Sequence, residues 1–196
     1  MVAIGEQEKV FRNGKRSTIS YRFVPERPRM RVLVALLFMM LPPLSFAQPV
    51  GIEQRIATRD GVSLPIYAYW QDNAKATVVL FSGGGGGYGK VGENGWPSSG
   101  NFLIRTGQHW ANHPFNLVMV GRPSDGINLE DGNIRTGEAH AADNRALLKT
   151  LRQRATLPIW LVGTSMGTIS AAAAAIQDHE KLVAGIVLTS SITGYR

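Results

Sequence analysis

The sequence contains no cysteine. This absence excludes disulfide bonds, a thiolate nucleophile and cysteine-ligated metal sites. There is also no apolar run long enough to cross a bilayer as a helix, because the stretch from Val32 to Leu41 has only ten residues. No internal repeat is evident. With 196 residues, 44% hydrophobic and 18% charged, the chain has the length and composition of one globular domain.

The excess of positive charge is confined to the N-terminal part of the sequence. The formal net charge of +7 would by itself favour nucleic acid or an anionic surface as a partner. Eight of the 21 Lys and Arg residues lie in the first 31 positions, whereas 13 basic and 11 acidic side chains follow residue 47. The part of the chain after residue 47 is therefore nearly balanced in charge, and we expect no nucleic-acid partner.

Residues 30–47, MRVLVALLFMMLPPLSFA, follow the pattern of a secretory signal peptide. Arg31 supplies the basic start, ten apolar residues follow it, and Ser45 and Ala47 provide small side chains at the two positions that a signal peptidase reads. We expect cleavage after Ala47 and a secreted or periplasmic protein with no stable membrane span. A buried core helix over residues 32–41 is the alternative interpretation.

The first 29 residues form a basic, polar N-terminal extension without an apolar period. Either they are an unusually long basic region of the signal peptide, or the reading frame was begun too early and translation starts at Met30. The sequence leaves both interpretations open. In either case we expect the mature domain to span residues 48–196.

The pattern of apolar residues after position 47 predicts alternating strands and helices. Strands are predicted over residues 52–58, 62–69, 76–81, 116–120, 157–162 and 183–189, and helices over residues 101–112, 138–154 and 168–178. Residues 121–137 are polar and rich in turn formers, which predicts a loop. The first two strands read as an antiparallel hairpin. The alternation after them predicts an α/β fold with a doubly wound, mostly parallel sheet and helices on both faces.

The segment GTSMG, residues 163–167, fits the G-x-S-x-G pattern of a nucleophile elbow. That pattern requires a strand before it and a helix after it, and both are predicted here. A sharp strand-to-helix turn would lift the Ser165 hydroxyl out of the carboxyl edge of the sheet, and side chains at Gly163 or Gly167 would crowd that turn. The alternative is a tight glycine-bounded turn in which Ser165 is only a helix N-cap.

The segment SGGGGGYGK, residues 82–90, follows a predicted buried strand and has three interpretations. The part from Gly84 to Lys90 matches the spacing of a phosphate loop, but Val91 stands where a magnesium-binding Ser or Thr is needed. The following ENGWP also cannot start the helix that such a loop must cap. The second interpretation is an oxyanion loop, in which glycines let backbone N–H groups approach a substrate closely. The third is a flexible glycine linker.

Together the two glycine motifs resemble those of the α/β-hydrolase superfamily, from about residue 52 to the end of the chain. ATVVLF and the glycines after it look like the third strand and oxyanion loop of that superfamily. NLVMVGRPSDG looks like the fourth strand and its loop, WLVGTSMG is similar to the fifth strand and elbow, and LVAGIVLTSS is similar to the sixth strand.

The resemblance implies a serine hydrolase that needs no metal or cofactor. Ser165 would attack an ester or related acyl carbonyl of a small-molecule substrate, while Met166 and one of Gly84 or Gly85 would donate backbone N–H groups to the oxyanion. Ser82 stands where many esterases of this superfamily have His, which leaves the subfamily open. The substrate and the oligomeric state are also left open.

The other two members of a catalytic triad are missing from the expected places. In the superfamily the acid follows the seventh or sometimes the sixth strand, and the His follows the eighth. Here residues 190–193 hold no carboxylate, and the sequence stops at Arg196. We expect the four histidines to be surface or packing residues: His109, His113, His140 and His179.

Two of these histidines can be judged from helix geometry. His179 ends the helix that Ser165 begins, which places it about 18 Å from the elbow. His140 and a carboxylate of Asp143 or Glu138 have helix spacing, and we expect such a pair to be solvated.

We therefore expect a chain truncated before its triad acid and base. Such a chain alone would be poorly active or inactive, because a serine hydroxyl without a base is a weak nucleophile. Two alternatives remain. One is a non-catalytic binding domain of the same fold, and the other is a nucleotide-binding protein that uses the loop from Gly84 to Lys90.

Overall fold

The computed structural model describes residues 50–193. The chain divides into two units, Met1–Ala47 and Gln48–Arg196, and the described residues belong to the second unit. The predicted N-terminal extension, the signal segment and its cleavage position lie outside the described residues.

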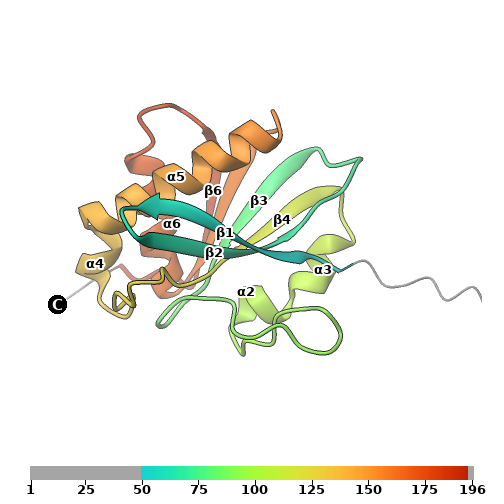
Figure 1. The fold of residues 1–196 in the computed structure, drawn as a ribbon, viewed down its shortest axis with the longest axis horizontal. Helices are drawn as coiled ribbons and strands as arrows, with labels where there is room; N and C mark the ends of the chain where they lie inside the picture. The colour runs from blue at the N-terminus through green and yellow to red at the C-terminus, as the bar shows by residue number, and fades with distance from the viewer. Residues whose placement is uncertain (1–49, 194–196) are drawn as a thin grey trace, which may run out of the picture. The chain divides into compact units, whose positions relative to one another are not determined.

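Within residues 50–193, six strands form one mixed sheet (Figure 1). They are β1 (Ile52–Arg59), β2 (Val62–Tyr69), β3 (Ala76–Phe81), β4 (Phe115–Val120), β5 (Ile159–Thr164) and β6 (Val183–Thr189). Their order across the sheet is β1-β2-β4-β3-β5-β6. The strand β2 pairs antiparallel with β1 and with β4, whereas β3 pairs parallel with β4 and β5, and β5 pairs parallel with β6. The predicted fold class, a mostly parallel sheet with an antiparallel hairpin first, is confirmed.

The central strand β3 is buried along its whole length because the sheet is covered on both faces. Successive side chains of a strand point to opposite faces. Val79 and Phe81 accordingly join one hydrophobic core, and Val78 and Leu80 join the other. An uninterrupted apolar run, rather than an alternating one, is what such a strand requires.

The helices are divided between the two faces of the sheet. They are α2 (Phe102–Arg105), α3 (Gly107–Ala111), α4 (Gly132–Thr136), α5 (Glu138–Arg154) and α6 (Met166–Ile176). Leu147 of α5 and Ala171 of α6 belong to one core, and Leu103 of α2 belongs to the other. In Figure 1, α5 lies above the sheet and α2 and α3 lie below it. No helix within residues 50–193 is long and apolar enough to cross a membrane.

The single helix predicted over residues 101–112 is wrong, because the structure breaks it at Thr106. The backbone of Thr106 has φ −91° and ψ 5°, outside the helical region. Its Oγ1 donates to the carbonyl of Phe102 at 2.8 Å, which competes with the backbone pattern of the helix. Gly107 then begins α3 where its backbone packs against the side chain of Met119.

Residues 121–137, predicted as a loop, contain the short helix α4. Its N-cap is Asp131, whose side chain accepts the N–H of Asn133 at 2.8 Å.

The boundaries near the elbow also differ from prediction, since β5 runs to Thr164 and α6 begins at Met166. Ser165 is therefore the only residue between them.

Candidate active site

Ser165 occupies a strained turn at the carboxyl end of β5. Its backbone has φ 51° and ψ −127°, a conformation that costs a non-glycine residue about 1–3 kcal/mol. The turn is held from both sides, because the Ser165 N–H donates to the carbonyl of Thr189 at 3.1 Å and the Ser165 carbonyl accepts the N–H of Thr168 at 2.9 Å. Ser165 is the N-cap residue of α6 by position, but its side chain makes no capping hydrogen bond. The residue is partly exposed.

The glycines on either side of Ser165 lie where no side chain fits. A Cβ at Gly163 would lie 2.5 Å from the carbonyl oxygen of Gly167. A Cβ at Gly167 would overlap the carbonyl of Phe81 and lie 2.8 Å from that of Ser82. The first turn of α6 therefore packs directly on the end of β3, which is possible only with glycine.

The five glycines after β3, residues 83–87, form a segment that we call the glycine loop. It meets Ser165 because β3 and β5 are parallel neighbours, with Phe81 opposite Gly163. A Cβ at Gly83 would lie 3.0 Å from the Cβ of Ser165. The sequence pointed to Gly84 and Gly85 and missed this contact. The adjacency of the two predicted strands was the signal that could have revealed it.

The glycine loop is closed by hydrogen bonds that engage only one of its five N–H groups. Ser82 Oγ, which is buried, donates to the carbonyl of Gly87 at 2.8 Å, and the N–H of Gly86 donates to the carbonyl of Gly83 at 3.1 Å. In the described part of the chain, the N–H groups of Gly83, Gly84, Gly85 and Gly87 donate to no protein acceptor, and Gly84 and Gly85 are the two predicted oxyanion donors among them. These two groups can therefore serve an external oxygen atom.

The start of α6 offers another donor. Met166 is the first residue of this 11-residue helix, so its N–H has no acceptor within the helix. The N-terminal end of a helix also carries a partial positive charge that favours an anion. Ser165, its neighbour Met166 and the glycine loop thus meet at the carboxyl edge of the sheet.

The glycine loop does not continue as a phosphate loop does. A phosphate loop leads directly into a helix. After Lys90, Val91 instead forms an isolated antiparallel bridge with Pro97, and the next helix begins only at Phe102. This path argues against the nucleotide-binding interpretation.

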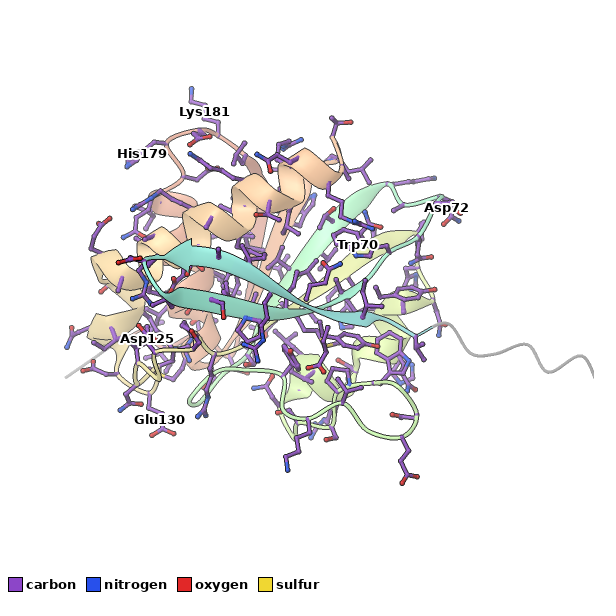
Figure 2. The ribbon with its side chains drawn as sticks, viewed as in Figure 1. Trp70, Asp72, Asp125, Glu130, His179 and Lys181 are labelled. Atoms are coloured by element: carbon purple, nitrogen blue, oxygen red, sulfur yellow. The ribbon has the colours of Figure 1, made fainter. Side chains whose placement is uncertain are left out.

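No base contacts the candidate nucleophile in the described residues. The Ser165 hydroxyl has no hydrogen bond to another side chain within residues 50–193. His179 precedes β6, which runs parallel to β5, so it lies at the amino edge of the sheet, opposite Ser165. In Figure 2, His179 and Lys181 project from the top of the view, whereas Asp125 and Glu130, in the segment after β4, lie at the bottom.

His140 is held elsewhere, and the expectation that it is solvated is wrong. Only 2% of the residue is exposed, and its Nε2 lies 2.9 Å from Ser170 Oγ, further along α6 than Ser165. Burial, together with the nearby Arg135 guanidinium, lowers the pKa of His140 to about 4. The imidazole is therefore neutral at pH 7 and belongs to the interior.

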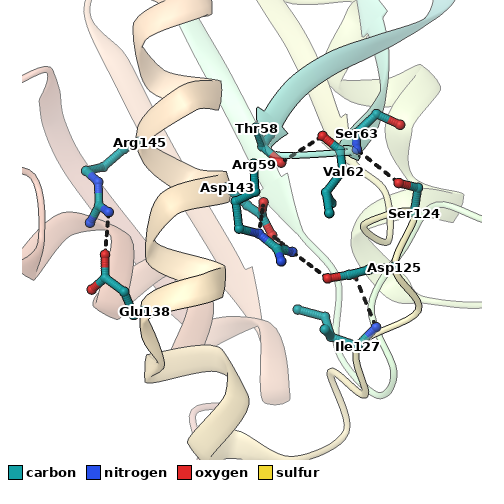
Figure 3. Close-up of polar contacts among 10 residues, drawn as sticks. All are labelled: Thr58, Arg59, Val62, Ser63, Ser124, Asp125, Ile127, Glu138, Asp143 and Arg145. Carbon is teal, nitrogen blue, oxygen red and sulfur yellow. Dashed lines mark hydrogen bonds and ion pairs between the residues drawn. The ribbon is translucent and has the colours of Figure 1, made fainter.

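The carboxylates expected near His140 have other partners (Figure 3). Asp143 is fully buried and accepts two hydrogen bonds from Arg59, at 2.9 and 3.0 Å. The same guanidinium contacts Asp125 at 2.8 Å, and these carboxylates raise the pKa of Arg59. Glu138 pairs with Arg145 on the surface of α5 at 2.5 Å. Neither acid hydrogen-bonds to His140: Asp143 is buried against Arg59, contrary to the expectation, whereas Glu138, with 82% of its side chain exposed, is solvated as expected.

The described part of the chain contains no cluster of potential metal ligands. Across residues 50–193, no group of three or more His, Asp or Glu side chains is arranged to hold a metal ion.

Comparisons with known proteins link this arrangement to solved structures only. No family model matches the sequence, and a search of curated proteins gives no match. An esterase from Pyrococcus furiosus is 16% identical, with 74% of this chain and 50% of that chain covered and a TM-score of 0.53. A predicted hydrolase from Thermoplasma acidophilum is 18% identical, covers 72% of this chain and 63% of that chain, and has a TM-score of 0.48.

A cold-adapted esterase from an Arctic intertidal metagenomic library is similar at 16% identity, over 70% of this chain and 58% of that chain, with a TM-score of 0.48. The chain spans about half the length of the Pyrococcus furiosus esterase that it matches. That match, together with the strand order of the sheet, shows that residues 50–193 have the α/β-hydrolase fold.

Proposed function

We propose that this chain is an exported serine hydrolase of the α/β-hydrolase type, in which Ser165 attacks a carboxylic ester or a related acyl group. The observation that carries the proposal is the strained backbone of Ser165, with φ 51°, beside the backbone of Gly83. Strain of this kind persists where the surrounding structure enforces it, and it is common at active sites. The α/β-hydrolase fold supports the same reaction class by analogy.

The proposed reaction is an acyl transfer through a covalent intermediate. Ser165 Oγ forms a bond to the acyl carbon, its proton passes to a base, and the carbonyl oxygen becomes an oxyanion. The N–H groups of Met166 and of Gly84 or Gly85 would stabilise that charge. The alkoxide then leaves with a proton, and water hydrolyses the acyl-serine to regenerate the hydroxyl.

The acid and base of the triad are proposed to come from outside residues 50–193. The edge strand β6 supports this view, because Ile186, Val187 and Leu188 are each 39–42% exposed on consecutive positions. Consecutive side chains point to opposite faces, so β6 presents apolar surface on both sides. Such surface is typical of a strand covered on both faces, as β3 is here.

Acetylation by p-nitrophenyl acetate tests the proposal. Imidazole added to the solution would act as an external base, and intact-mass measurement with peptide mapping would place one acetyl group on Ser165. The Ser165→Ala chain, under the same imidazole concentration, gives the background from other nucleophiles. Equal acetylation of the two chains would reject the proposed nucleophile.

A non-catalytic binding domain of the same fold is the second candidate. It is favoured by one observation, the lack of any side chain hydrogen-bonded to the Ser165 hydroxyl within the described residues. This candidate predicts that imidazole does not accelerate acetylation of Ser165.

A further inference from the structure

Arg135 is a buried cation that joins three separate segments: the one after β4, the helix α6 and the glycine loop. It lies on α4 and only 2% of the residue is exposed. Its Nε donates to the carbonyl of Leu129 at 2.6 Å, its Nη1 donates to Ser170 Oγ at 2.7 Å, and its Nη2 donates to the carbonyl of Gly84 at 2.6 Å. A guanidinium with a rigid fork of donors can fix the relative positions of such acceptors, which a single ammonium group cannot.

The bond to Gly84 determines the direction of a neighbouring N–H group. The carbonyl of Gly84 and the N–H of Gly85 belong to one planar peptide unit, and in a trans peptide they point in opposite directions. All peptide bonds in the described residues are trans. Because Arg135 holds the carbonyl, the N–H of Gly85 points away from Arg135.

Such a restraint matters because the hydrogen bonds that close the glycine loop do not hold the Gly84 carbonyl or the Gly85 N–H. Glycine has the largest conformational freedom of any residue, and five occur in succession here. Gly84 and Gly86 also have positive φ values, 56° and 75°. The peptide between Gly84 and Gly85 is the central one of the turn closed by the Gly86 N–H and the Gly83 carbonyl, and without an external anchor it could flip within that turn.

We propose that Arg135 is a positioning residue that aims the N–H of Gly85 at the oxyanion formed over Ser165. This inference rests on the proposed function. The same guanidinium binds Ser170 on α6, the helix whose first residue is Met166. Arg135 therefore ties the glycine loop and α6, the two sources of oxyanion donors, to one rigid group.

Ser170 Oγ joins Arg135 to His140, and the tautomer of His140 decides the direction of the second hydrogen bond. Ser170 Oγ accepts from Arg135, so its own proton is free to be donated to Nε2 of His140. With the proton on Nε2 instead, His140 would donate to Ser170 Oγ, and in either case Nδ1 is buried without a partner among the described residues. Both directions fit a neutral imidazole. Burial supports it, since the pKa of His140 is lowered to about 4.

The test compares three variants of the full chain. Arg135→Met removes all three hydrogen bonds, and Arg135→Lys retains a cation that can satisfy only part of them. Arg122→Met is the matched control, because Arg122 Nε donates at 3.2 Å to the carbonyl of Gly86 in the same loop. Circular dichroism and a thermal unfolding curve establish that each variant is folded before it is compared.

The first measurement is the order of the loop, which does not depend on reactivity. In protein labelled with ¹⁵N-glycine, we expect the backbone order parameters of Gly84 and Gly85 to be about 0.85 in the wild type. In Arg135→Met they should fall below about 0.6. Arg135→Lys should lie between them. Unchanged order parameters in a folded Arg135→Met chain would overturn the inference, whatever Ser165 does.

The second measurement is the reaction of Ser165 with a fluorophosphonate in imidazole buffer. Here Ser165 Oγ bonds to phosphorus, the P–F bond breaks, fluoride leaves, and imidazole takes the proton. Loss of one oxyanion donor lowers rate constants by about 10²–10³. We expect Arg135→Met to lower the limiting rate constant at saturating probe at least tenfold and to leave the half-saturating probe concentration within about twofold, because these donors act on the transition state.

The outcomes separate this inference from the proposed function. If the wild-type Ser165 reacts but the limiting rate constant is the same in Arg135→Met, or falls as much in Arg122→Met, the positioning role is rejected and the proposed function stands. If Ser165 never reacts while Arg135→Met disorders the loop, the proposed function fails, and with it the catalytic part of the inference. A role of Arg135 in stability alone would lower the fraction of reactive protein and leave the rate constant unchanged.

Discussion

The backbone of Gly83 lies directly against the side chain of Ser165. A Cβ at Gly83 would be 3.0 Å from the Ser165 Cβ and 2.9 Å from the carbonyl oxygen of Thr164. Two segments separated by about 80 positions in the sequence thus meet at backbone distance, and the contact exists because β3 and β5 are neighbours. Any side chain at Gly83 must displace either the elbow or the glycine loop.

Replacement of Gly83 by Ala should therefore reduce the reactivity of Ser165 without unfolding the protein. A small displacement of a reacting group can cost up to about a hundredfold in rate, and we expect a loss of about tenfold in imidazole-assisted fluorophosphonate labelling. Gly100→Ala is the control, since a Cβ there meets nothing within 4 Å. Equal labelling rates in the two variants would show that the contact has no influence on Ser165.

Replacement of the elbow glycine Gly167 by Ala should lower the free energy of unfolding far more than replacement of Gly83 does. The added Cβ of Gly167→Ala would overlap the carbonyl of Phe81, and a backbone carbonyl at the end of a central strand cannot rotate away. Overpacking of this kind costs about 1–3 kcal/mol in the free energy of unfolding. Urea unfolding measures the loss, and Gly100→Ala should stay within about 0.5 kcal/mol of the wild type.

The buried carboxylate of Asp143 should contribute more to stability than the exposed one of Asp125. Both contact Arg59, but Asp143 is fully buried whereas 24% of the Asp125 side chain is exposed. Removing one partner of a buried ion pair costs about 3 kcal/mol or more, and an exposed pair contributes at most about 1 kcal/mol. Denaturant unfolding of Asp143→Asn and Asp125→Asn should show this difference. Similar losses would contradict it.

The buried His140 should make the protein less stable as the pH falls. Its pKa is about 4 in the folded chain and 6.5 as the ordinary value, so between these limits the unfolded chain binds more protons. The contribution of the neutral His140 to the free energy of unfolding is fully present above pH 6.5. It decreases by about 3 kcal/mol as the pH falls towards 4. Urea unfolding at pH 7.0 and 4.5 measures the loss, which should be smaller in His140→Gln. An equal pH dependence in both chains would show that another group is responsible.

The parts of the fold that the sequence predicted are those set by local patterns. The apolar run of β3 is short and is followed by glycines, which favours a strand buried on both faces over a helix, and the position of Ser165 follows from the predicted strand before it and the predicted helix after it. The break at Thr106 was missed because a Thr side chain that bonds back to its own helix leaves no mark on the apolar pattern.

The polar interior was not predictable because its partners are distant in the sequence. Arg59 and Asp143 are 84 positions apart, and the spacing of Asp143 along α5 says nothing of Arg59. Arg135 occurs in a segment rich in turn formers, where a charged side chain is usually solvated. Only the packing of α4 between the glycine loop and α6 reveals that it is buried.

The central claim is that Ser165 is a nucleophile whose activating base lies outside residues 50–193. The most direct measurement is the rate of fluorophosphonate labelling of the 196-residue chain, with and without imidazole, followed by peptide mapping. The account predicts slow labelling confined to Ser165, a clear acceleration by imidazole, and no labelling of the Ser165→Ala chain. Rapid labelling of Ser165 without imidazole, or labelling that persists in Ser165→Ala, would contradict it.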